Sequence, residues 1–422
     1  MLPIPLLAFL HFMNLSLLRR HFPQFEHENS RVLDNFYDLP IYQPYYGEML
    51  AKVSLSVFLC SRLIDIRVGK LSFSEKMKSK MIQSMMKRII FSKRFNYSLD
   101  SYMKINRVIP MNWYSTSFHG QTNAIVFHEM FPIMAVCTYT CRIYRIQKDL
   151  STFDEVSVFF AGGQHTSFLS ACFHRRLPIL ALGGYDGIVH ICSMNLDGTK
   201  AMIFCTFPIR EGPIWSLVFH PTLPILFVST ERTGNVVILH FTKDFQRLQF
   251  ELKVRIHVDT INSIKIHKDI HFLLTTSDDH TARISTFDSN FRVLVPISVL
   301  RHGYKVLSGA IHPYLPLVAT GSDDNYAKIW NVSDIKNPRC IIQLLHSEGV
   351  RCLHFGFGFT LLTGSYSGSV SLWNIEDEDV VPERPIFVIP KQCSILSFGV
   401  NPNDPTNIVV GDSREVTSYK LE

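Results

Sequence analysis

The stretch FHPTLPIL, residues 219–226, recurs along this chain. Near copies begin at residues 127, 173 and 311, and they read FHEMFPIM, FHRRLPIL and IHPYLPLV. A weaker copy, IHKDIHFL, begins at 266, and the same slot continues at Phe355 and Phe398, so that successive units start 43 to 47 residues apart. A fixed period of this size predicts a propeller or a solenoid.

Each unit has the composition of short strands joined by tight turns. Within residues 300–332, we expect strands at Val306–Ile311, Pro316–Thr320 and Ala327–Val332. Gly, Pro, Asn and Asp fill the segments between them, and Gly321-Ser322-Asp323-Asp324-Asn325 has the residues of a tight turn. The length between units leaves room for a fourth strand in each.

Residues 107–422 resemble the WD-repeat β-propeller family. That family places a Gly-His near the start of each repeat, an Asp in a turn and a Trp-Asp near the end. Here the Trp slot keeps Trp330 and Trp373, whereas the other units hold Tyr144, Cys192, Leu239, Ser285 and Tyr419. The resemblance implies a pairing of the early His with the turn Asp within one blade, at His165–Asp186, His257–Asp279 and His302–Asp324. A fourth early histidine, His346, has Ser367 in the Asp slot.

Seven units share one phase, which predicts an all-β, seven-bladed propeller. Glu422 follows directly on the third strand of the last unit. An open outer edge at that strand would be a pairing hazard. Residues 107–114, RVIPMNWY, precede the first unit, and we expect them to close the ring as the outer strand of the last blade.

The recurring histidines do not predict a metal site. His128, His174, His220, His267 and His312 occupy one slot in five different units. Ligands of one metal must converge within a few ångström, whereas such residues are spread around a ring. We therefore expect a structural role in the turns. The nine cysteines include no CxxC pair, Cys137 and Cys141 being the closest, which favours a reducing, intracellular compartment, cytoplasmic or nuclear.

The sequence offers no catalytic signature. We find no P-loop, no GxGxxG after a strand, no GxSxG elbow and no HExxH, so we expect neither enzymatic activity nor a cofactor. In the resembled family, partners often dock on the face formed by the turns between second and third strands. Two slots map to that face.

The slot before the turn Asp holds Tyr185, Arg232, Asp278, Asp323, Tyr366 and Asp412. The slot near the start of the first strand holds Leu169, Trp215, Asn262, Leu307, Arg351 and Ser394. Trp, Tyr and Arg are enriched at binding hot spots. Candidate partner-binding residues are therefore Tyr185, Trp215, Arg232, Arg351 and Tyr366. Ordinary rim positions are the alternative, and Asp278 and Asp323 oppose nucleic acid on this face.

The basic charge lies in the N-terminal quarter. Residues 1–110 carry 16 Lys and Arg against 8 Asp and Glu, whereas the whole chain carries 42 against 36. Residues 71–95 predict an amphipathic helix with a Met and Ile stripe and a basic remainder. Such a helix packs on the rest of the chain with its charged face in solvent, or it binds acidic membrane, a calmodulin-like groove or nucleic acid. We divide the region into 1–70, mainly helical, and 71–106, the basic helix and linker.

Residues 2–20, LPIPLLAFLHFMNLSLLRR, are similar to the start of an F-box. Leu6, Leu7 and Leu10 fit its leucine slots, whereas Pro5 stands where an acid is usual. The resemblance implies that these leucines bind a Skp-type adaptor. Three hypotheses follow: a non-catalytic protein-interaction scaffold, which the sequence favours; an F-box-type substrate receptor of a cullin ubiquitin ligase; and a propeller held on membrane or nucleic acid by residues 71–95.

Overall fold

The computed structural model describes most of residues 108–421, and all described residues lie in one compact unit, Met103–Glu422. The described ranges are 108–115, 121–146, 153–160, 167–195, 200–267, 272–288, 293–313, 315–356, 359–375, 382–402, 404 and 406–421. The predicted helical region, the F-box-like segment 2–20 with Leu6, Leu7 and Leu10, and the basic helix 71–95 lie outside them.

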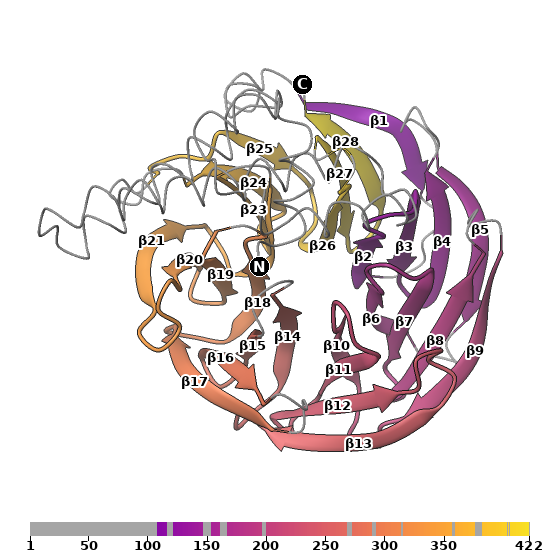
Figure 1. Cartoon of the computed structure of the whole chain (residues 1–422). Helices are drawn as coiled ribbons and strands as arrows, with labels where there is room; N and C mark the ends of the chain where they lie inside the picture. Colours follow the sequence, from indigo (N-terminus) through magenta and orange to yellow (C-terminus); the bar gives the residue numbers. More distant parts are fainter. Residues whose placement is uncertain are drawn as a thin grey trace, which may run out of the picture. The chain divides into compact units, whose positions relative to one another are not determined.

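Within these ranges, 28 strands form seven four-stranded antiparallel sheets, arranged as blades around a central axis (Figure 1). Blade 1 has β2 (Ala124–Phe127), β3 (Ile133–Cys137), β4 (Thr140–Ile146) and β5 (Phe153–Phe160). Blade 2 has β6 (Phe168–Phe173), β7 (Ile179–Gly184), β8 (Ile188–Met194) and β9 (Ala201–Pro208). Blade 3 has β10 (Ile214–Phe219), β11 (Ile225–Thr230), β12 (Asn235–Phe241) and β13 (Leu248–Arg255).

The same order continues through the C-terminal half. Blade 4 has β14 (Ile261–Ile266), β15 (Phe272–Ser277), β16 (Thr281–Phe287) and β17 (Leu294–Arg301). Blade 5 has β18 (Val306–Ile311), β19 (Leu317–Ser322), β20 (Tyr326–Asn331) and β21 (Arg339–Leu345). Blade 6 has β22 (Val350–Phe355), β23 (Thr360–Ser365), β24 (Ser369–Asn374) and β25 (Phe387–Pro390). Blade 7 has β26 (Ile395–Val400), β27 (Asn407–Asp412), β28 (Val416–Leu421) and β1 (Val108–Ser115).

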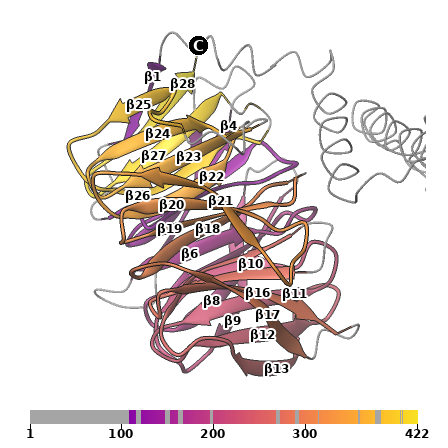
Figure 2. The same ribbon diagram turned by 90° about the vertical axis from the view of Figure 1, so that its left-hand side faces the viewer.

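The hydrophobic core lies between neighbouring blades, which face one another around the ring (Figure 2). Every residue of β11 is buried, whereas β13 at the outer edge alternates between half-buried and exposed. Val189 and Ile191 of blade 2 pack in one cluster with Val228 and Val237 of blade 3. Each such side chain stabilises the fold by about 1.5–3 kcal/mol when fully buried. A single blade cannot bury its two faces by itself, because each face packs on a neighbouring blade. All faces are covered only when the ring is closed.

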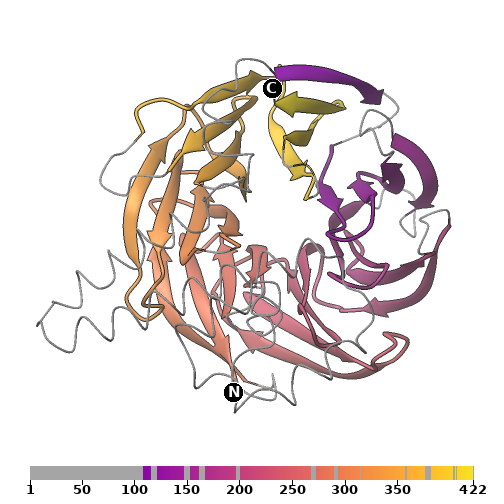
Figure 3. The same cartoon turned by 45° about the horizontal axis from the view of Figure 1, so that its top comes forward.

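The predicted closing strand is present as β1. It pairs antiparallel with β28, from Val108 opposite Leu421 to Ser115 opposite Val416 (Figure 3). Ser397 Oγ of blade 7 accepts a hydrogen bond from the Ile125 amide of blade 1 at 3.0 Å. The first and last described strands are therefore joined in blade 7, and the seven-bladed count is confirmed.

The strand bounds predicted for blade 5 differ slightly at the turn. The expected strand Pro316–Thr320 begins at Leu317 and continues to Ser322, so the tight turn is shorter than expected. Gly321 pairs with both Ser308 and Ala327 and belongs to the sheet. Pro316 has no N–H to donate to a neighbouring strand, which places it before the paired segment.

Candidate protein-binding face

A β-bulge recurs near the start of the innermost strand in blades 2 to 7. In β10, Ile214 pairs with Thr230 and Ser216 with Ser229, so Trp215 is the extra, unpaired residue. The corresponding residues in the six blades are Leu169, Trp215, Asn262, Leu307, Arg351 and Leu396. A bulge re-aims the side chain of the extra residue. The slot near the start of the first strand is therefore a slot of bulges in these six blades.

The turns between second and third strands lie at the same end of the blades as the bulges. The Asp323 amide donates to the Lys305 carbonyl, and the Tyr366 amide donates to the Gly349 carbonyl. Both acceptors precede an innermost strand by one residue. We call this end of the propeller the turn face, and it carries both of the slots that the sequence analysis selected.

An ordered polar network occupies the turn face in blades 4 and 5. Asn262 Nδ2 donates to Asp278 Oδ1 at 2.7 Å, and Lys305 Nζ lies 2.7 Å from Asp278 Oδ2. The Lys305 side chain is about half exposed, so this ion pair stabilises the fold by only about 0–1 kcal/mol. Its effect is to fix the side chains that a partner would meet.

Arg351 and Tyr366 come together beside this network in blade 6. Arg351 is half-buried and has no hydrogen bond or ion pair within the described part of the chain. Burial raises the pKa of Tyr366, and the Arg351 charge opposes that rise. Burial likewise raises the pKa of Asp323, again against the positive charges of Lys305 and Arg351. This cluster thus holds a guanidinium and a carboxylate whose hydrogen-bonding groups are not engaged with each other.

The other three candidates lie on blades 2 and 3. Trp215 is half-buried, and among the described residues its Nε1 has no hydrogen-bond partner. Arg232 is an extra residue in its turn, with φ of 60°, and its side chain is 84% exposed. Tyr185 is 54% exposed. The five candidates therefore share the turn face, with Arg351 and Tyr366 in one group and the rest on neighbouring blades.

Further apolar residues on the turn face escaped the sequence analysis. Tyr139, Val258 and Tyr304 are more than half exposed, and the Tyr304 ring stacks on His280 with centroids 5.5 Å apart. Tyr139 lies in the short turn of blade 1, a unit that has lost the family's Asp. A search of every turn residue in each unit, instead of two slots alone, would have found them.

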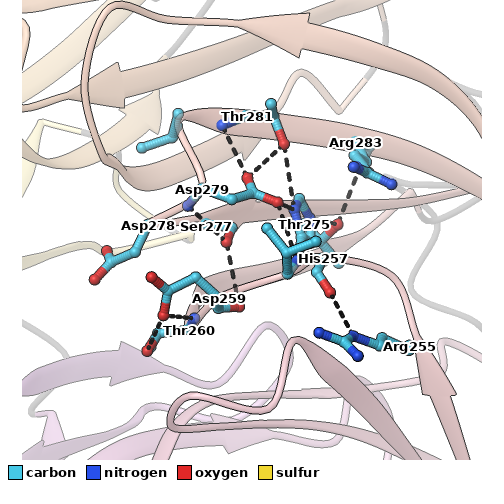
Figure 4. Close-up of polar contacts among 12 residues, drawn as sticks. Arg255, His257, Asp259, Thr260, Thr275, Ser277, Asp278, Asp279, Thr281 and Arg283 are labelled. Carbon is cyan, nitrogen blue, oxygen red and sulfur yellow. Dashed lines mark hydrogen bonds and ion pairs between the residues drawn. The ribbon is translucent and has the colours of Figure 1, made fainter.

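His257, Asp279 and Thr275 form a buried network in blade 4 (Figure 4). His257 Nδ1 lies 2.9 Å from Asp279 Oδ2, and His257 Nε2 lies 2.8 Å from Thr275 Oγ1. Thr281 adds a hydrogen bond of 2.6 Å to Asp279 Oδ1. The network joins the segment before the first strand of the blade to the turn between its second and third strands.

Blade 5 has a network of the same kind, which also includes a tryptophan. Trp330 Nε1 donates to Thr320 Oγ1 at 2.8 Å, Thr320 lies 2.7 Å from His302 Nε2, and His302 Nδ1 lies 2.9 Å from Asp324 Oδ2. Burial lowers the pKa of His302 despite the neighbouring carboxylate, so the neutral ring donates from Nδ1. Burial opposes ionisation of Asp324, but hydrogen bonds from His302 and the Gly303 amide outweigh it and lower the pKa of that carboxyl.

Blades 6 and 7 replace parts of the network. In blade 6, His346 and Trp373 still meet at Thr363 Oγ1, at 2.8 and 3.0 Å, while Ser367 bonds Ser365 instead of the histidine. In blade 7, the histidine slot holds Lys391.

The Lys391 amide donates to the Gly368 carbonyl, as the His302 amide donates to the His280 carbonyl. Lys391 Nζ lies 2.6 Å from Glu415 Oε1 and 3.6 Å from Asp412 Oδ2. Sequence reasoning missed this lysine because the family pattern looks for histidine.

Lys391 also corrects two slot assignments in the last unit. Five residues separate His302 from Leu307 and His346 from Arg351, and five from Lys391 lead to Leu396 rather than Ser394, so the assignment of Ser394 was wrong. Asp412 is not a rim residue: it ends β27 and is 2% exposed. The turn of this blade is one residue shorter than in blade 5, which shifts the alignment.

His165 lies outside the described residues, so its pairing with Asp186 stays a prediction. Asp186 Oδ1 accepts the Ile188 amide, as the turn Asp of blade 5 accepts the Tyr326 amide. Asp186 therefore caps its turn in the same way as Asp324 caps the turn of blade 5.

The recurring histidines hold turns at the opposite end of the blades. His174 Nδ1 accepts the amides of Arg176 and Leu177, and His220 Nδ1 accepts those of Thr222 and Leu223. The His128 ring also packs on Phe173 of the next blade. In the described ranges, no group of His, Cys, Asp and Glu is arranged to hold a metal, and no helix there is long and apolar enough to cross a membrane.

A family model for the WD domain, G-beta repeat, matches three stretches: residues 249–284, 294–331 and 338–374. Each stretch runs from the outer strand of one blade through the third strand of the next. The propeller contains WD40 repeats. The matches cover the blades with the His–Asp and His–Thr–Trp networks, and none of them reaches the F-box-like residues 2–20.

The curated relatives carry names from different cellular processes. The chain is 26% identical over 205 residues to WD repeat-containing protein pop2 of Schizosaccharomyces pombe, covering 40% of this chain and 27% of that protein. It is 31% identical over 192 residues to ribosome biogenesis protein bop1-A of Xenopus laevis, covering 41% and 24%. It is 26% identical over 156 residues to pre-mRNA-processing factor 19 of Mus musculus, covering 37% and 29%. The chain spans less than a third of these relatives.

Proposed function

We propose that this protein is a non-catalytic, intracellular interaction scaffold that binds another protein on the turn face of its propeller. The observation that carries the proposal is the shared position of bulge and turn residues. Trp215 and Arg351 are bulge residues, and Tyr185, Arg232 and Tyr366 come from the adjoining turns. Trp, Tyr and Arg are the residue types that contribute most at protein interfaces.

The polar surroundings favour a protein partner over a nucleic acid. Asp278 and Asp323 lie on the same face as Arg351, and Lys305 is already engaged with Asp278. A phosphate backbone would meet these carboxylates, whereas protein interfaces accommodate charges of both signs. Exposed Tyr139, Tyr185 and Tyr304 add apolar area with a hydrogen-bonding tip.

The test is a quantitative comparison of bound proteins. Wild type, Trp215→Ala with Arg351→Ala, and Leu177→Ala with Leu223→Ala are each purified from the protein's own cells, and the retained proteins are measured by mass spectrometry. Leu177 and Leu223 lie in turns at the opposite end of the blades and serve as the matched control. We expect a partner retained by wild type and by the control to be lost from the turn-face variant. Equal retention by all three proteins would refute the proposal.

The receptor hypothesis remains a prediction that rests on residues 2–20. It requires Leu6, Leu7 and Leu10 to bind a Skp-type adaptor. Incubation of the full chain, and of its Leu6→Asp with Leu10→Asp variant, with purified adaptor tests it. If the wild type does not bind the adaptor, the receptor hypothesis is refuted and the scaffold proposal stands. The membrane or nucleic-acid hypothesis is tested by comparing two proteins, the full chain and a variant that lacks residues 71–95. The binding of each to acidic vesicles and to RNA is measured.

A further inference from the structure

The acidic charge of the turn face is concentrated in blades 4 to 6. Six segments form the face there: residues 256–260, 278–280, 302–305, 323–325, 346–349 and 366–368. Their one Lys or Arg is Lys305, and their six carboxylates are those of Asp259, Asp278, Asp279, Asp323, Asp324 and Glu348. With Arg351 of β22 included, six negative charges stand against two positive ones, a net of −4. The corresponding segments of blade 3, residues 209–213 and 231–234, hold two arginines and two glutamates, which balance.

Contacts between blades 4 and 5 join their segments into one surface. Lys305 Nζ lies 2.7 Å from Asp278 Oδ2, and the Tyr304 ring stacks on His280 with an angle of 11° between the ring planes. The Val258 amide donates to the carboxylate of the blade 4 turn at 3.3 Å. Val258 and Tyr304 are 68% and 58% exposed. An exposed apolar border therefore lies beside the acidic segments.

Gly349 joins blades 5 and 6. A Cβ atom at this position would lie 2.6 Å from Asp323 Oδ1 and 3.2 Å from the Tyr366 ring, so the carboxylate and the ring both pack on this glycine. Asp323 is half-buried, and Glu348, next to Gly349, is exposed. Within the described ranges, neither of these two carboxylates has a hydrogen bond or an ion pair. Both of them therefore have hydrogen-bonding capacity to offer a partner.

Lys305 does not neutralise the acidic segments on its own. The hydrogen bond to Asp278 raises the pKa of Lys305, and the charges of Asp278, Asp259 and Asp323 add to that rise, so one ammonium group serves three carboxylates. Burial raises the pKa of Asp323, and repulsion from Asp278 contributes to the same rise. A further positive charge near these carboxylates would reduce their mutual repulsion.

We propose that the partner bound on the turn face presents a basic segment to blades 4 to 6. Its lysine or arginine side chains meet Asp323 and Glu348, and an apolar side chain packs on Val258 and Tyr304. The inference rests on the proposed function and adds the chemistry of the partner. Complementary charge across an interface speeds association and disfavours the wrong partners. Tyrosine contributes apolar area with a hydrogen-bonding tip, which suits a segment of mixed character.

Arg351 is compatible with a basic partner. A guanidinium donates hydrogen bonds to uncharged acceptors, among them the main-chain carbonyls of an extended segment. An acidic segment would have the opposite balance, because it would face six carboxylates with only Lys305 and Arg351 to attract it. Like charges that meet across an interface are strongly unfavourable. The charge balance therefore favours a basic segment over an acidic one.

The experiment selects binders to the full chain from two libraries of short peptides. In the first library, every position is drawn from lysine, leucine, tyrosine and glycine, and in the second, glutamate replaces lysine. We expect enrichment from the lysine library alone. The enriched peptides should bind the variant Asp323→Asn with Glu348→Gln about tenfold more weakly than the wild type, because ion pairs across the interface are lost.

The control variant is matched in charge. Asp334→Asn with Glu383→Gln makes the same change in loops between third and fourth strands, at the opposite end of the blades, and should bind the peptides as the wild type does. Asp323 and Glu348 have no hydrogen-bonded partner among the described residues, so their replacement should leave the melting temperature unchanged. Lys305→Met removes the internal cation and should bind the peptides more tightly than the wild type.

Three results would overturn the inference. The first is enrichment from the glutamate library; if those peptides are lost from Trp215→Ala with Arg351→Ala, the proposed function stands while the basic partner does not. The second is enrichment from neither library. The third is equal binding of lysine peptides by the wild type and by Asp323→Asn with Glu348→Gln, since the carboxylates would then take no part. The proposed function itself is decided separately, by the partner that the turn-face variant loses.

Discussion

Asp324 shows how much one side chain contributes to a blade. It accepts hydrogen bonds from His302 Nδ1 at 2.9 Å, from the Gly303 amide at 2.8 Å and from the Tyr326 amide at 3.1 Å. In Asp324→Ala, these donors lose their acceptor, and His302 is enclosed without a partner on Nδ1. We expect a loss of about 1–3 kcal/mol in the free energy of unfolding.

Ser367→Ala is the matched comparison, because Ser367 occupies the same slot in blade 6. It bonds only Ser365 and Ser369, and its neighbours keep each other as partners. We expect a loss below about 1 kcal/mol. Urea midpoints at one pH measure both variants, and equal shifts would contradict the assigned role of Asp324.

The buried histidines make the fold sensitive to acid. Burial lowers the pKa of His174 to about 4, and burial also lowers the pKa of His128, His257, His302 and His346. In the unfolded chain these histidines titrate near pH 6.5. Each unit of pKa difference between the unfolded and folded states corresponds to about 1.4 kcal/mol in the free energy of unfolding. The unfolded chain thus binds more protons below pH 6.5, so the free energy of unfolding falls as the pH drops from about 6.5 toward 4.

Urea unfolding at pH 7.5, 6.0 and 5.0 measures this dependence. Most carboxylates remain ionised over that interval, so the histidines dominate the change. We expect the midpoint to be highest at pH 7.5, lower at pH 6.0 and lower again at pH 5.0. A midpoint that is constant down to pH 5.0 would show that the imidazoles are not enclosed as neutral groups.

At the scale of one element, blade 7 stabilises its turn with a lysine instead of a histidine. The side chains of Lys391 and Asp412 are 6% and 3% exposed. In Lys391→Met, Asp412 and Glu415 lose their cation, and breaking a buried pair in this way costs about 3–5 kcal/mol. Lys243→Met, at an exposed loop position after β12, is the control and should change the stability little.

A second variant separates the ion pair from simple packing. Lys391→Met with Asp412→Asn removes both charges, while the amide oxygen still accepts the Arg414 and Glu415 amides that Asp412 Oδ1 accepts now. We expect the double variant to unfold at a higher urea concentration than Lys391→Met alone. A double variant that is less stable than the single one would assign the loss to packing.

Elements also show where the sequence was informative. The spacing of His, Pro and Gly predicted seven blades in the correct phase, because each blade repeats the same burial pattern and turn chemistry. The spacing placed Trp215 and Arg351 in one slot, but it could not show that this slot is a bulge, since a bulge depends on pairing with the next strand. Lys391 and Leu396 escaped notice because blade 7 solves the same packing problem with other residues.

On the scale of the whole propeller, closure makes stability a property of the ring. Each blade covers its neighbours' faces, and blade 7 depends on β1 from the opposite end of the described sequence. Val108, Ile109 and Pro110 pair with Leu421, Lys420 and Tyr419, and Tyr114 pairs with Thr417. A chain without β1 leaves the edge of β28 unpaired, which exposes its backbone groups to other chains.

We therefore expect a chain of residues 107–422 to fold into a stable propeller. A chain of residues 119–422 should not fold into one. The two chains differ by the segment that contains β1, and in the shorter one β28 has no outer neighbour. Because the blades enclose one another's faces, the defect in blade 7 also weakens its contacts with blades 1 and 6, so the loss should extend beyond one sheet. Thermal unfolding followed by circular dichroism, with size-exclusion chromatography, distinguishes a cooperative monomer from an aggregating or non-cooperative chain. Equal melting temperatures would mean that the ring holds without its closing strand.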